Sequence, residues 1–241
     1  MTGLAIGTSG FDYEHWVGAF YPRDLERGRR LEFYARTFST LELNVTFYRT
    51  PKASAFSRWR DIVSDEFRFA VKASRYLTHI RRLRAPREPV EFLMDRVSRL
   101  DNRLGPILIQ LPPDMRVDLD RLAATLDAFG EGVRVAFEPR HPSWFRDEVC
   151  RLLAAHDAVL CLVDRRGPKT PAWRTAGWVY ARFHAGRASP PSCYGSTALA
   201  SWADRLRDGR SRPPEGFAYF NNDGHGCAIR NALQLRRLLD R

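Results

Sequence analysis

Eight short apolar runs recur roughly thirty residues apart along the chain, and this spacing limits the possible folds more than any other feature. The runs read as strands that begin at Leu4, Thr40, Phe67, Pro106, Val133, Val159, Trp178 and Phe217. Between them, apolar residues follow helical spacing over 31–38, 90–104, 119–129, 147–156, 199–206 and 228–239. Such alternation predicts an α/β fold of the (β/α)8, TIM-like barrel type.

Length and composition fit one barrel domain that spans residues 1–241. The chain has 241 residues, of which 44% are hydrophobic, and this suffices for one large core. Met1 is followed almost at once by the first strand, and no apolar run is long enough to cross a bilayer. We therefore expect a cytoplasmic protein without membrane association. The four cysteines form no close pairs, which predicts free thiols.

The alternation of side chains within the strands predicts a polar barrel mouth. In the third strand Phe69 and Val71 face the helices, so Lys72 faces the interior; in the fifth, Phe137 faces out and Glu138 faces in. Barrel interiors are normally filled by apolar side chains, so inward charges must pair or meet a ligand. The same parity places a set of polar residues at the carboxyl ends of the strands: Glu42, Asn44, Lys72, Gln110, Glu138, Arg182 and His184.

The net charge of +11 favours an acidic partner. Only three of the 39 basic residues are lysine, and this bias is also what a purely solvated, compositional basic surface would give. The placement of the charges favours function, because the loops after the third, sixth and seventh strands open on the catalytic face of a barrel. These loops predict a basic rim of Arg81, Arg82, Arg84, Arg87, Arg165, Arg166, Lys169, Arg174 and Arg187.

Motifs at the strand ends resemble a known family. They include GTSGFDYEHWVGAFYP, LELNVTFYRTP, LGPILIQLPP, AFEPRHPSWF, YARFHAG and YFNNDGHGCAIRNALQL, in an order that runs from about Gly7 to Leu239. Together they are similar to the domain of unknown function 72 (DUF72), or YecE-like, family. The resemblance implies a TIM-barrel-like fold and a family without an established reaction.

Four inward residues are the candidate catalytic groups. Glu42 and Glu138 suit a general base, because nearby cations favour the carboxylate; alternatively they belong to a structural ion-pair network. Lys72, a lysine in an arginine-rich chain, suits phosphate binding or proton donation. His184 is the candidate acid or electrophile.

Other strand-end residues are candidates for substrate binding. Asn44, Gln110 and Asn222 could orient hydroxyls or cap loops, with neither reading preferred. The segment EPRHPSW places Arg140 and His141 just after Glu138, and an arginine side chain can bind a phosphate or carboxylate with two hydrogen bonds. The glycine-rich turn around His225 precedes a helix, which suits a phosphate or an ordinary turn. We also assign Arg182 to this binding set.

A metal site is the less favoured alternative, and we expect no cofactor. Glu138, Asp164 and His184 end three consecutive strands and are ligand types of divalent-metal barrels. Cations at the same mouth would repel a divalent ion, since Lys72 and Arg140 are predicted there.

The residues favour an enzyme that acts on a phosphate-bearing substrate, most plausibly by phosphoester hydrolysis in a nucleotide or nucleic acid. A non-catalytic nucleic-acid-binding protein is the first alternative, with Trp16, Tyr21 or Trp144 stacking on bases. A carbohydrate-active barrel that uses the two glutamates is the second. The oligomeric state is left open.

Overall fold

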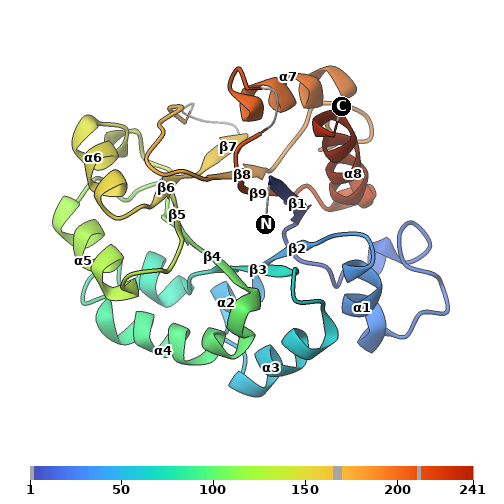
Figure 1. Cartoon of the computed structure of the whole chain (residues 1–241), viewed down its shortest axis with the longest axis horizontal. Coiled ribbons are helices and arrows are strands. Elements are labelled where there is room, and N and C mark those ends of the chain that lie inside the picture. Colours follow the sequence, from blue (N-terminus) through green and yellow to red (C-terminus); the bar gives the residue numbers. More distant parts are fainter. Residues whose placement is uncertain (1–2, 165–169, 211–212, 241) are drawn as a thin grey trace.

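The computed structural model describes residues 3–164, 170–210 and 213–240. Its strands are parallel and curve around a common axis, and helices surround them on the outside (Figure 1). This confirms the predicted TIM-like α/β architecture. The strands are β1 (Leu4–Thr8), β2 (Thr40–Leu43), β3 (Arg68–Lys72), β4 (Leu104–Gln110), β5 (Val135–Glu138), β6 (Val159–Leu160), β7 (Leu162–Asp164), β8 (Val179–Phe183) and β9 (Gly216–Phe220).

The ring consists of two hydrogen-bonded sheets, which corrects the expectation of one closed barrel ladder. The sheet orders are β1-β9-β8-β7 and β2-β3-β4-β5-β6. On one side, an isolated bridge between Ser9 and Glu42 joins β1 to β2. On the other, the predicted sixth strand is divided at Cys161, so that β6 pairs with β5 while β7 pairs with β8.

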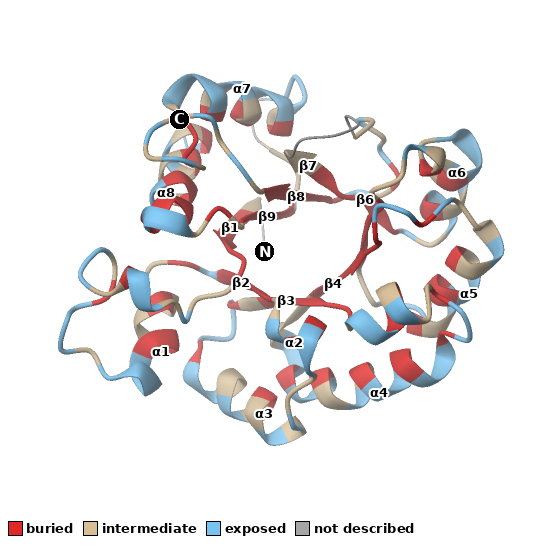
Figure 2. Cartoon of the chain, turned by 180° about the vertical axis from the view of Figure 1, so that it is seen from behind, coloured by how far each residue is buried: buried red, intermediate tan, exposed pale blue. Residues whose placement is uncertain are grey.

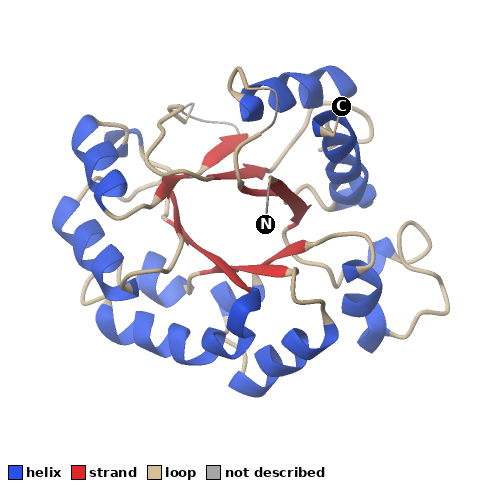
Figure 3. Cartoon of the chain, viewed as in Figure 1, coloured by secondary structure: helices blue, strands red, loops and turns tan. Residues whose placement is uncertain are grey.

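Helices cover the outside of the ring (Figure 3). All six predicted helical segments contain helix, whereas α2 and α3 were not predicted. The described residues between β7 and β8 form no helix. The helices are α1 (Arg30–Ala35), α2 (Val45–Tyr48), α3 (Ala53–Ile62), α4 (Arg87–Val97), α5 (Leu119–Phe129), α6 (Asp147–Ala155), α7 (Ser196–Arg207) and α8 (Cys227–Leu239), with short helical turns η1 (Glu14–Trp16), η2 (Arg27–Arg29), η3 (Tyr76–Ile80), η4 (Ser98–Arg103), η5 (Pro142–Trp144) and η6 (Gly224–Gly226).

Two separate apolar clusters confirm the predicted strand parity. The larger one packs the outward faces of the strands against the helices and includes Phe69 and Phe137. The smaller one fills the ring with inward residues such as Ala70, Leu108 and Tyr180. The strands are buried on both faces (Figure 2), so polar side chains inside the ring must find partners there.

A disulfide corrects the expectation of four free thiols. Cys193, in the loop after β8, is bonded to Cys227 at the start of α8, with the Cα atoms 5.0 Å apart. The sequence separation of 34 residues gave no sign of this, because only the fold brings the two segments together. Cys150 and Cys161 are not disulfide-bonded. No helix among the described residues is long and apolar enough to span a membrane.

The junction of β1 and β2 depends on a glycine. A Cβ atom added to Gly7 would lie 2.2 Å from the carbonyl oxygen of Thr40, far inside van der Waals contact. The two backbones can therefore approach only where position 7 lacks a side chain. Two residues further along the chain, an isolated bridge pairs Ser9 with Glu42.

We predict that Gly7→Ala lowers the free energy of unfolding by about 1 to 3 kcal/mol, as over-packing of a filled core does. The matched control is Gly28→Ala, because a Cβ atom at Gly28 meets no atom within 4 Å. Urea unfolding of both variants measures the difference. Equal stability of the two variants would contradict the close approach.

Candidate functional site

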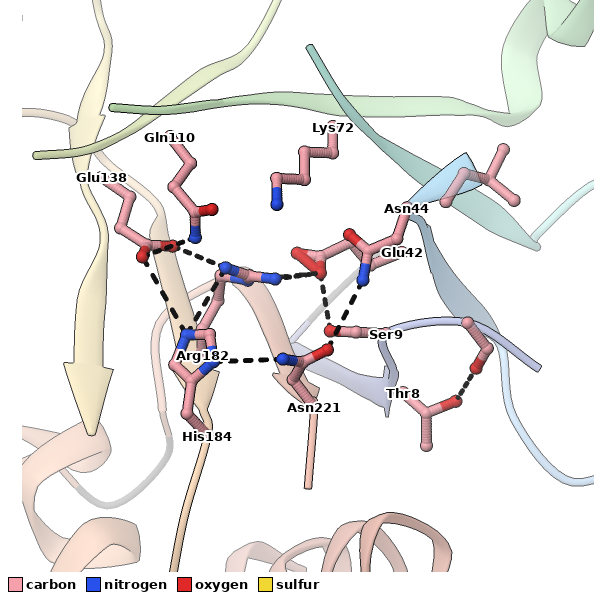
Figure 4. Close-up of polar contacts among 12 residues, drawn as sticks. Thr8, Ser9, Glu42, Asn44, Lys72, Gln110, Glu138, Arg182, His184 and Asn221 are labelled. Carbon is pink, nitrogen blue, oxygen red and sulfur yellow. Dashed lines mark hydrogen bonds and ion pairs between the residues drawn. The ribbon is translucent and has the colours of Figure 1, made fainter. Parts of the chain in front are cut away.

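Arg182, on β8, lies at the centre of the mouth and pairs with two glutamates (Figure 4). Its Nη2 and Nε donate to Oε1 of Glu42 on β2 at 2.9 and 3.2 Å, and its Nη1 donates to Oε2 of Glu138 on β5 at 2.7 Å. All three side chains are at most 1% exposed. The guanidinium therefore ties two distant strands together across the ring.

Both carboxylates also have further hydrogen-bond partners. Glu42 accepts from Ser9 Oγ at 2.6 Å and from the Tyr180 hydroxyl at 2.7 Å. Glu138 accepts from Gln110 Nε2 at 2.7 Å, and Arg140 Nε lies 3.6 Å from the same oxygen. These bonds favour the structural-network interpretation over proton transfer by either glutamate.

The Glu138 carboxyl group is held ionised. Burial alone would raise its pKa, but the nearby charges of Arg182, His184 and Arg140 outweigh burial and lower the pKa to about 2. A group that stays ionised at every physiological pH is a weak base and cannot donate a proton. Its predicted catalytic role stays a prediction.

Lys72 differs from the other charged groups of the mouth. Its side chain is largely buried, and Nζ lies 4.0 Å from the ring centroid of Phe47. Among the described residues, no hydrogen bond or ion pair is formed by this ammonium, so the expected association with Glu138 is not a direct pair. Burial and the positive charge of Arg182 lower the pKa of Lys72 to about 8.

Neutral polar groups complete the mouth. His184 Nδ1 lies 3.1 Å from Asn221 Nδ2, and its Nε2 lies 3.4 Å from Arg182 Nη1. Burial and Arg182 lower the pKa of His184 to about 4, and burial and Lys72 do the same for His79 on η3. Because of these low pKa values, both imidazoles are uncharged at neutral pH, which suits hydrogen bonding to a ligand better than protonating it.

The amides of the mouth also contact one another, since Asn44 Nδ2 lies 3.5 Å from Asn221 Oδ1.

Three predicted binding residues lie outside this cluster. Asn222 is buried and donates to the Ser192 carbonyl oxygen at 2.8 Å and to Asn231 at 3.0 Å, so it fixes the loop after β8. His141 caps η5. His225 is exposed in η6, with a backbone φ of 56°. After β9, the side chain that points toward the site is that of Asn221 and not that of Asn222 (Figure 4).

The three residues predicted as metal ligands do not come together in the structure. Asp164 accepts a hydrogen bond from Trp202 of α7 at 3.3 Å, so it points into the helix layer and away from Glu138 and His184. Within residues 3–164, 170–210 and 213–240, no group of three His, Cys, Asp or Glu side chains could hold a metal ion.

Sequence reasoning missed several partners of the glutamates. Ser9 is not among the candidate residues, yet it donates to Glu42. Tyr180 is not among them either, and its hydroxyl also donates to Glu42. Phe47, on the short helix α2 after β2, was missed as the aromatic contact of Lys72. The signal for Ser9 was its position one residue beyond β1, where parity continues.

The stacking and rim predictions need correction. Trp16, Tyr21 and Trp144 are 0%, 1% and 0% exposed, so their rings are packed in the core beneath the loops and cannot stack on a ligand. Arg81 and Arg82 are paired with Glu88 and Asp114. Arg174 pairs with Asp208 beyond the C-terminal end of α7, so it is not at the mouth, and Arg165, Arg166 and Lys169 lie outside the described residues. Exposed residues from the predicted rim include Arg84, Arg87 and Arg187.

The fold and the polar strand ends define a TIM-barrel-like α/β protein with its candidate site at the barrel mouth. Residues 5–241 match the family described as "Protein of unknown function DUF72", and the chain belongs to this family.

Relatives and solved structures agree with this. The chain is 35% identical over 116 residues to the UPF0759 protein YecE of Escherichia coli K12, a match that covers 48% of this chain and only 43% of YecE. It is 24% identical to the UPF0759 protein YunF of Bacillus subtilis, and the match covers 98% of this chain and 95% of YunF. A crystal structure of a DUF72 family protein from Thermotoga maritima has a TM-score of 0.86 and 27% identity, and the match covers 99% of this chain and 100% of that chain.

We predict that Arg182→Met destabilises the protein by about 3 to 5 kcal/mol, because two buried carboxylates lose their counter-charge. Arg27→Met is the control: Arg27 also pairs with a carboxylate, but its side chain is 70% exposed, so solvent screens the pair and its loss should change the stability far less. Chemical unfolding at neutral pH compares them. A similar small loss for both variants would show that the buried pairing is unimportant.

Stability should also depend on acid pH through Glu138. Its pKa is lowered from 4.5 to about 2 in the folded state, so its contribution is full above pH 4.5 and is lost as the pH falls toward 2. We expect the thermal midpoint of Glu138→Gln to fall less steeply than that of the native protein over this interval. Parallel curves would argue that Glu138 titrates normally.

Proposed function

We propose that this protein is an enzyme that acts on a phosphate-bearing substrate at the barrel mouth, by phosphoester hydrolysis in a nucleotide or nucleic acid. One observation carries the proposal. Arg182 occupies both buried carboxylates, and this leaves the Lys72 ammonium without a carboxylate partner among the described residues. A desolvated cation in this position suits an anionic ligand.

The proposed roles follow from charge and exposure. Arg140, with a side chain 29% exposed, and Lys72 bind phosphate oxygens. With a pKa of about 8, Lys72 is mostly protonated at neutral pH yet acidic enough to give a proton to the leaving oxygen. The neutral His184 and the amides of Asn44, Gln110 and Asn221 orient the substrate. Glu42 and Glu138 hold Arg182 in place.

Non-catalytic nucleic-acid binding is a second candidate, supported by exposed aromatic residues near the site. Tyr48 is 81% exposed and lies 5.1 Å from Phe47 between ring centroids, and Tyr76 is 44% exposed. Such rings could stack on bases, in place of the buried aromatics named from the sequence. The carbohydrate alternative is weaker, because it needs two available carboxylates and Arg182 engages both.

The test is hydrolysis of p-nitrophenyl phosphate, bis(p-nitrophenyl) phosphate and a single-stranded oligonucleotide, each with and without added Mg²⁺. We expect Lys72→Met to reduce the rate by about 100-fold or more, as loss of a general acid does. Lys52→Met, which changes an exposed lysine, should leave the rate unchanged. Salt-sensitive oligonucleotide binding without turnover would favour the second candidate, and neither turnover nor binding would refute both.

The pH dependence gives a separate prediction. If Lys72 donates the proton, the hydrolysis rate falls as the pH rises through about 8, because the donor must be protonated. Initial rates between pH 6 and 10 measure this. A rate that stays level to pH 10 would exclude Lys72 as the donor.

A further inference from the structure

The surroundings of Lys72 are those that make an amine nucleophilic. An aromatic ring covers its ammonium. The charged or titratable groups that act on it are Glu42 from β2, His79 from η3, Glu138 and Arg140 at the end of β5, and Arg182 from β8. The two carboxylates in this set are hydrogen-bonded to Arg182. A lysine that is desolvated and next to another cation is the activated form used in covalent catalysis.

We propose that Lys72 captures a carbonyl compound that carries an anionic group, such as a phosphorylated aldehyde or ketone, as a protonated imine. This activity goes beyond hydrolysis, which requires no covalent bond to the lysine. It rests on the proposed function only for the anionic group, which Arg140 would hold.

The reaction balances without any added oxidant or reductant. The Lys72 ammonium first gives one proton to solvent, and the neutral Nζ attacks the carbonyl carbon, so that a C–N bond forms and the carbonyl electron pair moves to oxygen. A proton passes from nitrogen to this oxygen to give the carbinolamine, and solvent returns one proton to the hydroxyl, which leaves as water while the nitrogen lone pair forms the C=N bond. Ammonium and carbonyl thus become protonated imine and water, with one positive charge on nitrogen at the start and at the end. The charge of the mouth is therefore the same before and after capture, and Glu42 and Glu138 need not change protonation.

Titration of the amine supports this chemistry. With a pKa of about 8, roughly a tenth of Lys72 is neutral at pH 7, whereas an ordinary lysine with a pKa near 10.4 is neutral in fewer than about one in a thousand molecules. Capture at neutral pH should therefore select Lys72 on the order of 100-fold over an exposed lysine. Capture should increase as the pH rises to 8, opposite to the proposed hydrolysis.

The experiment uses the full chain with glyceraldehyde 3-phosphate or glyceraldehyde, a pair that differs only in the phosphate. Sodium borohydride reduces any imine to a stable secondary amine, and peptide mass spectrometry locates it. The chain has only three lysines, Lys52, Lys72 and Lys169, so the assignment is unambiguous. We expect one adduct, on Lys72, with the phosphorylated aldehyde preferred.

Two variants and the aldehyde pair separate the possible outcomes. Lys72→Arg keeps the charge and should lose the adduct, whereas Lys52→Arg should retain it. An adduct shared evenly among the lysines and the N-terminal amine, or retained in Lys72→Arg, would overturn the inference. Capture of both aldehydes at Lys72 with equal rates would support the imine but contradict the phosphate site. Hydrolysis without capture would support only the proposed function.

Discussion

The contact between Arg182 and the two buried glutamates is the constraint on which the rest of the mouth depends. Three charges inside a barrel cost much desolvation energy unless each hydrogen-bonding atom is satisfied. The additional donors are Ser9 after β1, Gln110 at the end of β4 and Tyr180 within β8. The network also lies where β1 and β2 are joined only by an isolated bridge, so side chains stabilise the ring where the backbone ladder is interrupted.

This pairing also determines the character of Lys72. If either carboxylate faced the ammonium directly, the ion pair would raise the pKa of the lysine. Instead Arg182 takes both carboxylates and adds a like charge nearby, so burial dominates and the pKa of Lys72 falls. Burial, together with the same positive surroundings, lowers the pKa of His79 and of His184 and keeps both imidazoles neutral. The mouth therefore combines one reactive cation with neutral hydrogen-bonding groups.

Strand periodicity predicted the architecture and most of the site. Alternation correctly placed Glu42, Lys72 and Glu138 inside the ring, because period-two geometry holds wherever a strand is regular. The two misses came from assigning residues by their place at a strand end without following the alternation. Leu160 and Leu162 face outward, so Asp164 does too, and Phe220 faces outward, so Asn221 and not Asn222 faces the site.

Contacts between distant segments were beyond reach of the sequence. Pairing of Cys193 with Cys227 and burial of Trp16 and Trp144 depend on how loops fold over the barrel, and no local pattern records this. The choice of partner inside the ring was equally hidden. Parity shows that Lys72, Arg182 and Glu138 face inward, but it does not show which cation reaches the carboxylate.

The most direct test of this account is the titration of the lysine side chains by nuclear magnetic resonance, with ¹³C-labelled lysine. Three lysines give three resonances, and Lys72→Arg assigns the relevant one. The account predicts that Lys72 titrates near pH 8 while exposed Lys52 titrates near the ordinary value of about 10.4. If Lys72 instead titrates at or above 10, its ammonium is not a desolvated cation beside Arg182, and the central claim of this account is contradicted.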